Sequence, residues 1–436
     1  MIYAEKQFGL NDIRIMDVDK LMGVVVIMLN LRKVYCADLT VGMHVSALDR
    51  PWLESPFLVQ GFYLENFEDI EEVSKFCEYV YVDEKIARGS VLKKTLADLP
   101  FGKSVAGKLF PNKKIKIYTD SVTWKEEFPS AKEAVDTLSG CLKELMARNE
   151  KGGPLEIAKI KKAVEPMIDS VTRNPDACIW LARMKQEDNY IYEHSLGASI
   201  WAVALGRQLG LPKQDLRTLA LGGLLFDVGK LKIDTALMNA NRRLTAEEFQ
   251  YVKSHVQLSV DSLKEGGLIN QDVIDMVAHH HERHNGGGYP QGLAGTEIPV
   301  FARIAAIVDC YDAITSHRIY AAALPPSLAI KKLYEWKDID FQAELIEEFI
   351  QAIGIYPAGT LVELSSGEIA IVVAEYRTRR LRPQVMIMLD KNKQPLEDIR
   401  FIDMLAVPFT EDGQPLDIVN SLEPGAYGID MTSIEL

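Results

Sequence analysis

The segment from residue 280 to residue 290, HHERHNGGGYP, constrains this chain more than any other part of the sequence. Its first two residues, His280 and His281, follow an apolar run over 273–277, a pattern typical of a helix that ends in paired imidazoles. Imidazole is the commonest metal ligand among side chains, and adjacent histidines at a helix end can point toward one site. The glycines at 286–288 allow the next turn to adopt backbone angles closed to other residues and to pass close to a ligand.

Four more residues with metal-binding side chains lie at well-separated positions. They are His194, Asp227, His255 and Asp309. A mixed set of imidazoles and carboxylates suits Mn, Fe, Ni, Zn and similar divalent ions, and the set contains no thiolate. For His194 or His255 alone, a hydrogen-bonded histidine without a metal is the simpler interpretation. The complete set, together with the histidine pair, favours a metal site.

The order and spacing of these motifs resemble the HD-GYP family, a branch of the HD phosphohydrolase superfamily that cleaves cyclic di-GMP. The motifs are Asp-Val-Gly-Lys at 227–230, the histidine at 255, His-His-Glu at 280–282, Gly-Tyr-Pro at 288–290, and Asp309 followed by Tyr-Asp-Ala at 311–313. The resemblance covers about residues 170 to 355. It implies a helical bundle that binds divalent metal ions.

The resemblance also implies which side chains bind metal. Asp227 would bridge two ions, because a carboxylate can bind two cations whereas a neutral imidazole cannot. Besides Asp227, the first ion would be bound by His194 and Asp309, and the second by His255, His280 and His281. The cofactors implied are two divalent metal ions, iron, manganese or similar, or one ion only where a site is incomplete.

Three positions bear on how complete the metal site is. The family takes its name from a His-Asp pair, and here the pair is Phe226-Asp227, so the first site lacks one of its protein ligands. Position 190, where some members carry a glutamate for a third metal, is Tyr190, which disfavours a trinuclear site. Asn285 stands where the family usually has aspartate, a milder change.

Further residues are expected to contact the substrate or support the ligands. Lys230 is placed to neutralise phosphate oxygens during in-line attack, and with Asp227 it forms the predicted catalytic pair. The alternative for Lys230 is a cation that stabilises a helix C-terminus. Arg318 matches a family position that contacts the substrate phosphate, and Tyr289 would stack on guanine or shape its turn. Asp312 either supports a metal ligand one helical turn earlier or is a solvated or capping residue.

The resemblance implies a metal-dependent phosphodiesterase that hydrolyses cyclic di-GMP to pGpG, GMP or both. The alternative is a catalytically degenerate receptor or scaffold that binds cyclic di-GMP, or a diguanylate cyclase domain through the Gly-Tyr-Pro turn, without turnover. That turn disfavours a general HD nucleotidase. A homodimer is compatible with the sequence.

The composition limits the kinds of partner that the protein is expected to bind and the compartment in which it is expected to lie. The formal net charge of −13 and the pI of about 5.2 argue against binding of DNA or RNA polymers and of anionic membranes, which needs a basic surface. The five scattered cysteines indicate reduced thiols and a cytoplasmic location. The longest apolar run near the start, 21–31, is too short to span a bilayer, and no signal-peptide cleavage site follows it.

The expected fold is mainly α: an HD-type helical bundle with a small α+β N-terminal domain and a short C-terminal β unit. The predicted ranges are 1–33 for an N-terminal extension, 34–92 for the small domain, 93–128 for a linker, 129–355 for the helical metal-binding domain, and 356–436 for the β-rich appendage. The small domain resembles one that often precedes HD-GYP domains. Its Trp52 and Phe57 form either a binding surface or, as we prefer, packing contacts.

Periodicity predicts the individual elements. Apolar residues recur at helical spacing in 68–78, 131–148, 154–171, 189–209, 212–225, 246–263, 271–281 and 298–316. Strand patterns cover 41–45, 79–83, 361–364, 369–373 and 385–389. Thr245 followed by Glu248 has the form of an N-terminal capping box, and the proline pair 325–326 ends one helix and can start the next.

Overall fold

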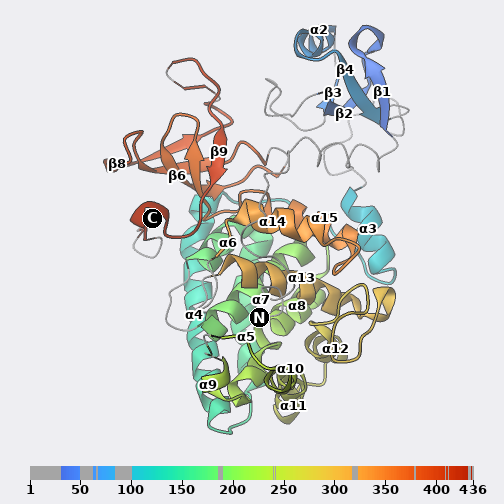
Figure 1. Cartoon of the computed structure of the whole chain (residues 1–436), viewed down its shortest axis with the longest axis vertical. Helices are drawn as coiled ribbons and strands as arrows, with labels where there is room; N and C mark the ends of the chain where they lie inside the picture. The colour runs from blue at the N-terminus through green and yellow to red at the C-terminus, as the bar shows by residue number, and fades with distance from the viewer. Residues whose placement is uncertain are drawn as a thin grey trace. The chain divides into compact units, whose positions relative to one another are not determined.

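The computed structural model (Figure 1) divides the chain into two compact units, Met1–Asp98 and Leu99–Leu436. The structure describes residues 31–49, 62–64, 67–83, 101–184, 190–238, 240, 242–316, 323–377, 380–407, 409–410, 412–430 and 434. Three residues that the sequence singled out, Trp52, Phe57 and Arg318, lie outside the described residues, as does most of the predicted extension.

The first unit contains a four-stranded antiparallel sheet in the order β1-β4-β2-β3. Its elements are β1 (Leu31–Tyr35), the 3₁₀ turn η1 (Cys36–Asp38), β2 (His44–Leu48), β3 (Phe62–Tyr63), α2 (Phe67–Phe76) and β4 (Tyr79–Asp83). Along β4, Val80 and Val82 are buried, whereas Tyr79 and Tyr81 are half-buried on the other face, as the period of two requires. The predicted strand 79–83 is confirmed, and α2 matches the helix predicted for 68–78.

Helices make up most of the second unit, as predicted. They are α3 (Phe101–Leu109), α4 (Trp124–Glu150), α5 (Ile157–Arg173), α6 (Pro175–Arg183), α7 (Tyr190–Gln208), α8 (Lys213–Leu225), α9 (Thr235–Met238), α10 (Ala246–Lys253), α11 (His255–Glu265), α12 (Gln271–His279), α13 (Val300–Thr315), α14 (Pro326–Glu335) and α15 (Ala343–Ile353). The 3₁₀ turn η4 (Val228–Lys232) follows α8. The predicted capping box of Thr245 and Glu248 is present at the start of α10, and α14 begins at Pro326.

Helix α7 occupies the centre of the helical body and packs against α5, α6, α8, α13 and α15 (Figure 1). Its side chains Ile200, Trp201 and Leu205 are almost completely buried. Tyr311 of α13 meets Trp201 edge-on, with ring centroids 5.2 Å apart. A helix that is apolar on most sides belongs in the interior, so α7 forms the core around which the others are arranged.

The C-terminal part of the second unit is a five-stranded antiparallel sheet in the order β8-β7-β6-β5-β9. Its strands are β5 (Leu361–Leu364), β6 (Ile369–Ala374), β7 (Gln384–Leu389), β8 (Pro395–Asp403) and β9 (Ile418–Ser421). The three predicted strands are confirmed. The sheet is joined to the helical body through Asp176 of α6, which accepts hydrogen bonds from the Glu375 backbone (3.0 Å) and from Arg377 (2.6 Å).

The range predicted as a linker contains structure of its own. Helix α3 and the start of α4 lie within 93–128. Phe110, just after α3, is buried and its ring lies 5.5 Å from that of Phe301 on α13, which explains why this segment is ordered against the bundle. Strand β1 likewise begins at Leu31, inside the predicted extension. In the described part of the chain, no helix is both long and apolar enough to cross a membrane.

Candidate metal centre

Asp227 is positioned by a close contact between η4 and α11. Gly229 lies so close to α11 that a Cβ atom there would meet the His255 carbonyl oxygen at 2.1 Å, and its backbone N–H donates to the Ser259 hydroxyl at 2.8 Å. Only glycine permits this approach. The contact places Asp227, which directly precedes η4, beside the imidazole of His255, with Oδ1 and Nε2 3.3 Å apart.

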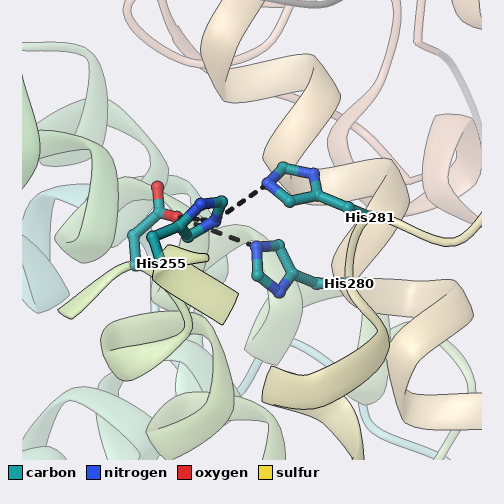
Figure 2. Close-up of side chains that lie close together, drawn as sticks. His255, His280 and His281 are labelled. Atoms are coloured by element: carbon teal, nitrogen blue, oxygen red, sulfur yellow. Dashed lines mark hydrogen bonds and ion pairs between the residues drawn. The ribbon is translucent and has the colours of Figure 1, made fainter. Parts of the chain in front are cut away.

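Three histidines, labelled in Figure 2, lie in one cluster with the Asp227 carboxylate. His255 and His280 each place Nδ1 2.7 Å from a backbone carbonyl, those of Val252 and Val277. A carbonyl can only accept, so both Nδ1 atoms carry the proton and both Nε2 atoms keep a lone pair that can bind a cation. The Nε2 of His280 lies 3.7 Å from Asp227 Oδ1, and the Nε2 of His281 lies 3.2 Å from that of His255.

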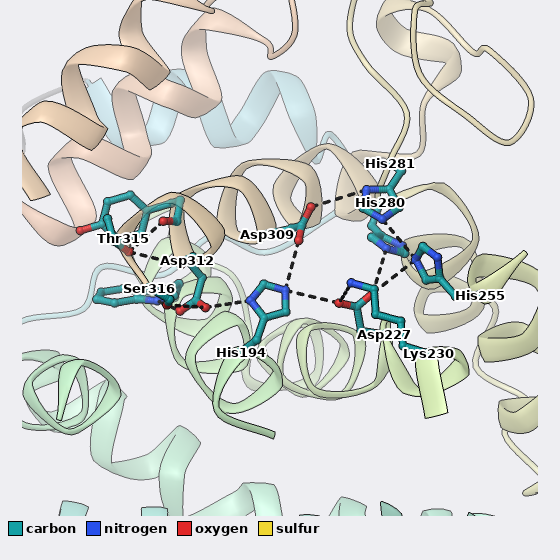
Figure 3. Close-up of polar contacts among 12 residues, drawn as sticks. His194, Asp227, Lys230, His255, His280, His281, Asp309, Asp312, Thr315 and Ser316 are labelled. Carbon is teal, nitrogen blue, oxygen red and sulfur yellow. Dashed lines mark hydrogen bonds and ion pairs between the residues drawn. The ribbon is translucent and has the colours of Figure 1, made fainter. Parts of the chain in front are cut away.

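A second cluster shares Asp227 with the first (Figure 3). The Nε2 of His194 lies 3.4 Å from Asp227 Oδ2 and 3.2 Å from Asp309 Oδ1. Its Nδ1 lies 2.8 Å from Asp312 Oδ2, and the other oxygen of Asp312 accepts a hydrogen bond of 3.0 Å from the Trp201 indole. Asp312 therefore orients His194, which decides between the two roles that the sequence allowed.

The structure thus brings together all six residues predicted to bind metal, although their ligation stays a prediction. Ligand atoms within each cluster lie within 4.8 Å of one another. Two nitrogen ligands on one zinc-like ion are separated by roughly 3 to 3.4 Å, close to the distances observed here. Among the described residues, Asp227 Oδ1, His280 Nε2 and His281 Nδ1 are buried without a hydrogen-bond partner, an arrangement that is costly unless a cation binds them. The residues fit divalent metal ions.

Electrostatics keep most of these groups in the ionisation state that binds metal. Burial lowers the pKa of His255, and burial together with the neighbouring histidines holds the pKa of His281 well below its usual value, so both are neutral at pH 7. Burial alone would raise the pKa of Asp227, but Lys230 and three histidines hold it well below its ordinary range. Despite the same opposing effect of burial, hydrogen bonding to His194 lowers the pKa of Asp309 to about 2.

Comparison with known proteins identifies the family. Residues 168–343 match the family model described as an HD domain, residues 31–160 match a domain of unknown function (DUF3391), and residues 361–408 match a KOW domain associated with HD domains. A cyclic di-GMP phosphodiesterase of Pseudomonas aeruginosa is 31% identical over 379 residues, which cover 84% of this chain and 87% of the relative. The chain belongs to the HD-GYP family. It is an HD-domain phosphohydrolase related to cyclic di-GMP phosphodiesterases.

Other relatives of this HD-GYP protein match over shorter ranges. A response regulator of Xanthomonas campestris named as a cyclic di-GMP phosphodiesterase is 31% identical over 34% of this chain and 39% of its own length. A 3′3′-cGAMP-specific phosphodiesterase of Vibrio cholerae is 28% identical over 38% of this chain and 36% of the relative. A solved HDGYP protein of Bdellovibrio bacteriovorus has a TM-score of 0.44 at 17% identity, covering 73% of this chain and 98% of that one.

Phe226 stands where the family has the histidine of its His-Asp pair. It is fully buried. Its ring stacks on the imidazole of His280, with centroids 4.8 Å apart and planes at 15°, and lies 5.6 Å from the ring of His194. Because phenylalanine offers no ligand atom, the cluster of His194, Asp227 and Asp309 has three candidate ligands, whereas the histidine-rich cluster has four.

Glu282 belongs to the His-His-Glu motif at 280–282, and the sequence analysis gave it no role of its own. Its carboxylate is buried and accepts hydrogen bonds from the backbone N–H groups of Gln291 (2.7 Å), Gly292 (3.2 Å) and Leu293 (3.1 Å). It therefore fixes the loop that carries the Gly-Tyr-Pro motif. The position of Glu282 between a histidine and an arginine was the available signal in the sequence. That position does not predict the hydrogen-bond donors, which lie about ten residues further along the chain.

The loop itself depends on the residues that the family signature prescribes. A Cβ atom on Gly288 would lie 2.4 Å from the Arg283 backbone nitrogen, so a larger residue would push the loop away. Asn285 accepts a hydrogen bond of 2.8 Å from the Gly287 N–H through its side-chain oxygen, which an aspartate could equally do. The loop places Tyr289 next to His281, with ring centroids 4.7 Å apart.

Lys230, which the sequence analysis expected to contact the substrate phosphate, forms an ion pair with Asp227.

Proposed function

We propose that this protein is a metal-dependent phosphodiesterase that hydrolyses cyclic di-GMP to pGpG, GMP or both. The observation that carries the proposal is the pair of buried clusters that share Asp227. The identity to a cyclic di-GMP phosphodiesterase over 84% of the chain supports the substrate. The net charge of −13 is no obstacle, since one dinucleotide needs only a local cation.

The proposed ligands of one divalent ion are Asp227, His255, His280 and His281, and those of a second are His194, Asp227 and Asp309. When bound, such ions polarise a phosphodiester and lower the pKa of a bound water to near 7. Iron or manganese suits this donor set.

The protein groups around the ions have separate tasks in the proposed reaction. Backbone carbonyls hold His255 and His280 in the tautomer that turns Nε2 inward. Lys230 balances the charge of Asp227 while the substrate is absent and is 15% exposed, so its ammonium can exchange that partner for a phosphate oxygen. We propose Tyr289 and Arg318 as further substrate contacts, Arg318 by resemblance alone.

Phe226 favours a second candidate function, a cyclic di-GMP receptor without turnover. In this case the histidine-rich cluster would hold a single ion. The receptor would bind cyclic di-GMP, or it would bind a diguanylate cyclase domain through the loop around Tyr289. The receptor differs from the enzyme in metal stoichiometry and turnover, while both bind the dinucleotide.

One experiment separates the two. The purified protein is analysed for metals by mass spectrometry and assayed with Mn²⁺ or Fe²⁺ against cyclic di-GMP and 3′3′-cGAMP, with Asp227→Asn as the matched control. We expect metal-dependent release of pGpG or GMP by the wild type and none by Asp227→Asn. Binding without turnover would establish the receptor, and absence of both binding and turnover would refute both functions.

A further inference from the structure

A lysine and two aromatic rings lie together beside the candidate metal centre. Of these three side chains, only Tyr289 belongs to the Gly-Tyr-Pro motif. Phe249 and Lys253 are one helical turn apart on α10, and both face Tyr289. The Phe249 and Tyr289 rings meet edge-on, with centroids 6.4 Å apart. The Lys253 ammonium lies 4.8 Å from the centroid of Phe249 and 5.0 Å from that of Tyr289. Tyr289 in turn lies 4.7 Å from His281.

The charge of Lys253 is not balanced by an acidic group in the part of the chain that the structure describes: its contacts there are with the two rings. Contact with aromatic faces orients an ammonium but leaves N–H donors for a further ligand. Lys230, the other lysine close to the centre, is already paired with Asp227. In a chain with a net charge of −13, an unbalanced cation at this place is suited to an anion that approaches the metal ligands.

We infer that Phe249, Lys253 and Tyr289 bind one purine base and the adjoining phosphate of a cyclic purine dinucleotide. All three side chains are half-buried. In the proposed complex, the Lys253 ammonium turns from the ring faces that it now covers to a non-bridging phosphate oxygen, and the base stacks on the faces so exposed. This inference rests on the proposed function and names the part of the site that selects a nucleotide substrate over a simple phosphodiester. Phe249 and Lys253 are specificity residues, while hydrolysis belongs to the metal ligands.

The structural alternative is that Phe249 and Lys253 only pack α10 against the Gly-Tyr-Pro loop. A conservative amino-acid substitution at Phe249 or Lys253 has different effects under the two roles. Loss of packing lowers the melting temperature and affects every substrate alike. Loss of a stacking surface affects only substrates that carry a base.

The test compares Phe249→Leu and Lys253→Met with two controls, Tyr251→Leu on the exposed side of α10 and Lys264→Met on α11. Affinity is measured with the hydrolysis-resistant bisphosphorothioate analogue of cyclic di-GMP on metal-loaded protein. Initial rates are measured with cyclic di-GMP and with an abasic dinucleotide, a phosphodiester of two sugars that carries no aromatic ring. The analogue reports binding whether or not the protein turns over substrate.

Because base–aromatic stacking and one charged contact each correspond to about a tenfold change in affinity or more, we expect that increase in the dissociation constant for either variant. The Phe249→Leu variant should hydrolyse the base-free diester at the wild-type rate. The Lys253→Met variant should show a weaker dependence of affinity on salt. The controls should match the wild type.

Unchanged affinity in both variants, or equal losses with both substrates accompanied by a lower melting temperature, would overturn the inference. Wild-type binding of the analogue without turnover would refute only the proposed enzymatic function, since the variants would still be ranked by affinity. A wild type that binds no analogue would refute both.

Discussion

The ring of Phe226 stacks on the imidazole of His280, with centroids 4.8 Å apart and planes at 15°. His280 belongs to the histidine-rich cluster, so an apolar ring lies directly against a proposed ligand. The stacking restrains the His280 ring while its Nε2 faces Asp227. Phe226 therefore has a definite structural effect on one cluster while it withholds a ligand from the other.

Replacement of Phe226 by histidine should restore the missing ligand of the His194 cluster. We expect Phe226→His to bind more metal per chain and to hydrolyse cyclic di-GMP faster than the wild type, because a buried imidazole is tolerated where a cation satisfies it. Metal analysis and initial rates check this. Phe226→Leu is the control: leucine offers no ligand atom either, so this variant should not bind more metal than the wild type. Equal metal content and rate in Phe226→His and the wild type would show that the substitution is not what limits this centre.

Asp312 should be required for tight metal binding although it is not itself a proposed ligand. It accepts from both His194 and Trp201 inside the bundle. Loss of a carboxylate that orients a metal-bound histidine typically reduces affinity or activity by about 10–100-fold, and we expect this for Asp312→Asn. Titration with Mn²⁺ measures the affinity. The control Asp261→Asn alters an exposed pair on α11 and should bind like the wild type. Wild-type affinity in Asp312→Asn would contradict the proposed role.

Metal binding should release a proton from His194. Burial opposes its charge, but hydrogen bonds to Asp227, Asp309 and Asp312 outweigh this and raise the pKa of His194 to about 10 in the metal-free protein. The proton must leave before a cation binds, so the apparent metal affinity should rise about tenfold per pH unit between pH 7 and 9. Calorimetry in buffers of different ionisation enthalpy counts the protons. A pH-independent affinity would show that His194 is not a ligand.

The same group should make the stability of the metal-free protein depend on pH. Because the pKa of His194 is higher in the folded than in the unfolded protein, its contribution to stability is complete below about pH 6.5 and is lost as pH rises through about 10. Chemical denaturation of chelator-treated protein between pH 6 and 10 measures this. The His194→Gln variant should show a flatter profile over the same range.

Gly229 should be necessary for both stability and metal binding. A methyl group there would meet the His255 carbonyl oxygen, and overpacking of this kind typically costs about 1–3 kcal/mol. We expect Gly229→Ala to melt at a lower temperature and to retain less metal, since η4 must move away from α11 and take Asp227 with it. Gly140→Ala is the matched control, because that site in α4 is open and alanine favours a helix. Normal metal retention in Gly229→Ala would refute the packing argument.

Much of the fold was predictable because its signals are local. The strands at 79–83 and 361–364 follow from alternation and flanking turns, and the start of α10 follows from the Thr245 and Glu248 side chains bonding to backbone nearby. Strands β8 and β9 were not predicted. Only one residue of β9, Ile418, is clearly buried, and β8 exposes Ile399 and Phe401, so neither carries a clean pattern.

The sequence by itself determined the list of proposed metal ligands, because their order along the chain matches a family in which each motif has a chemical task. It also showed that Phe226 removes one ligand. Only the tertiary structure decided which nitrogen of each histidine faces Asp227, where Glu282 finds its hydrogen-bond donors, and that Phe249 and Lys253 lie beside Tyr289. Those features depend on how α10, α11 and the loop after α12 pack against one another. A contact between residues about 40 positions apart, such as Phe249 and Tyr289, produces no periodic pattern in the sequence.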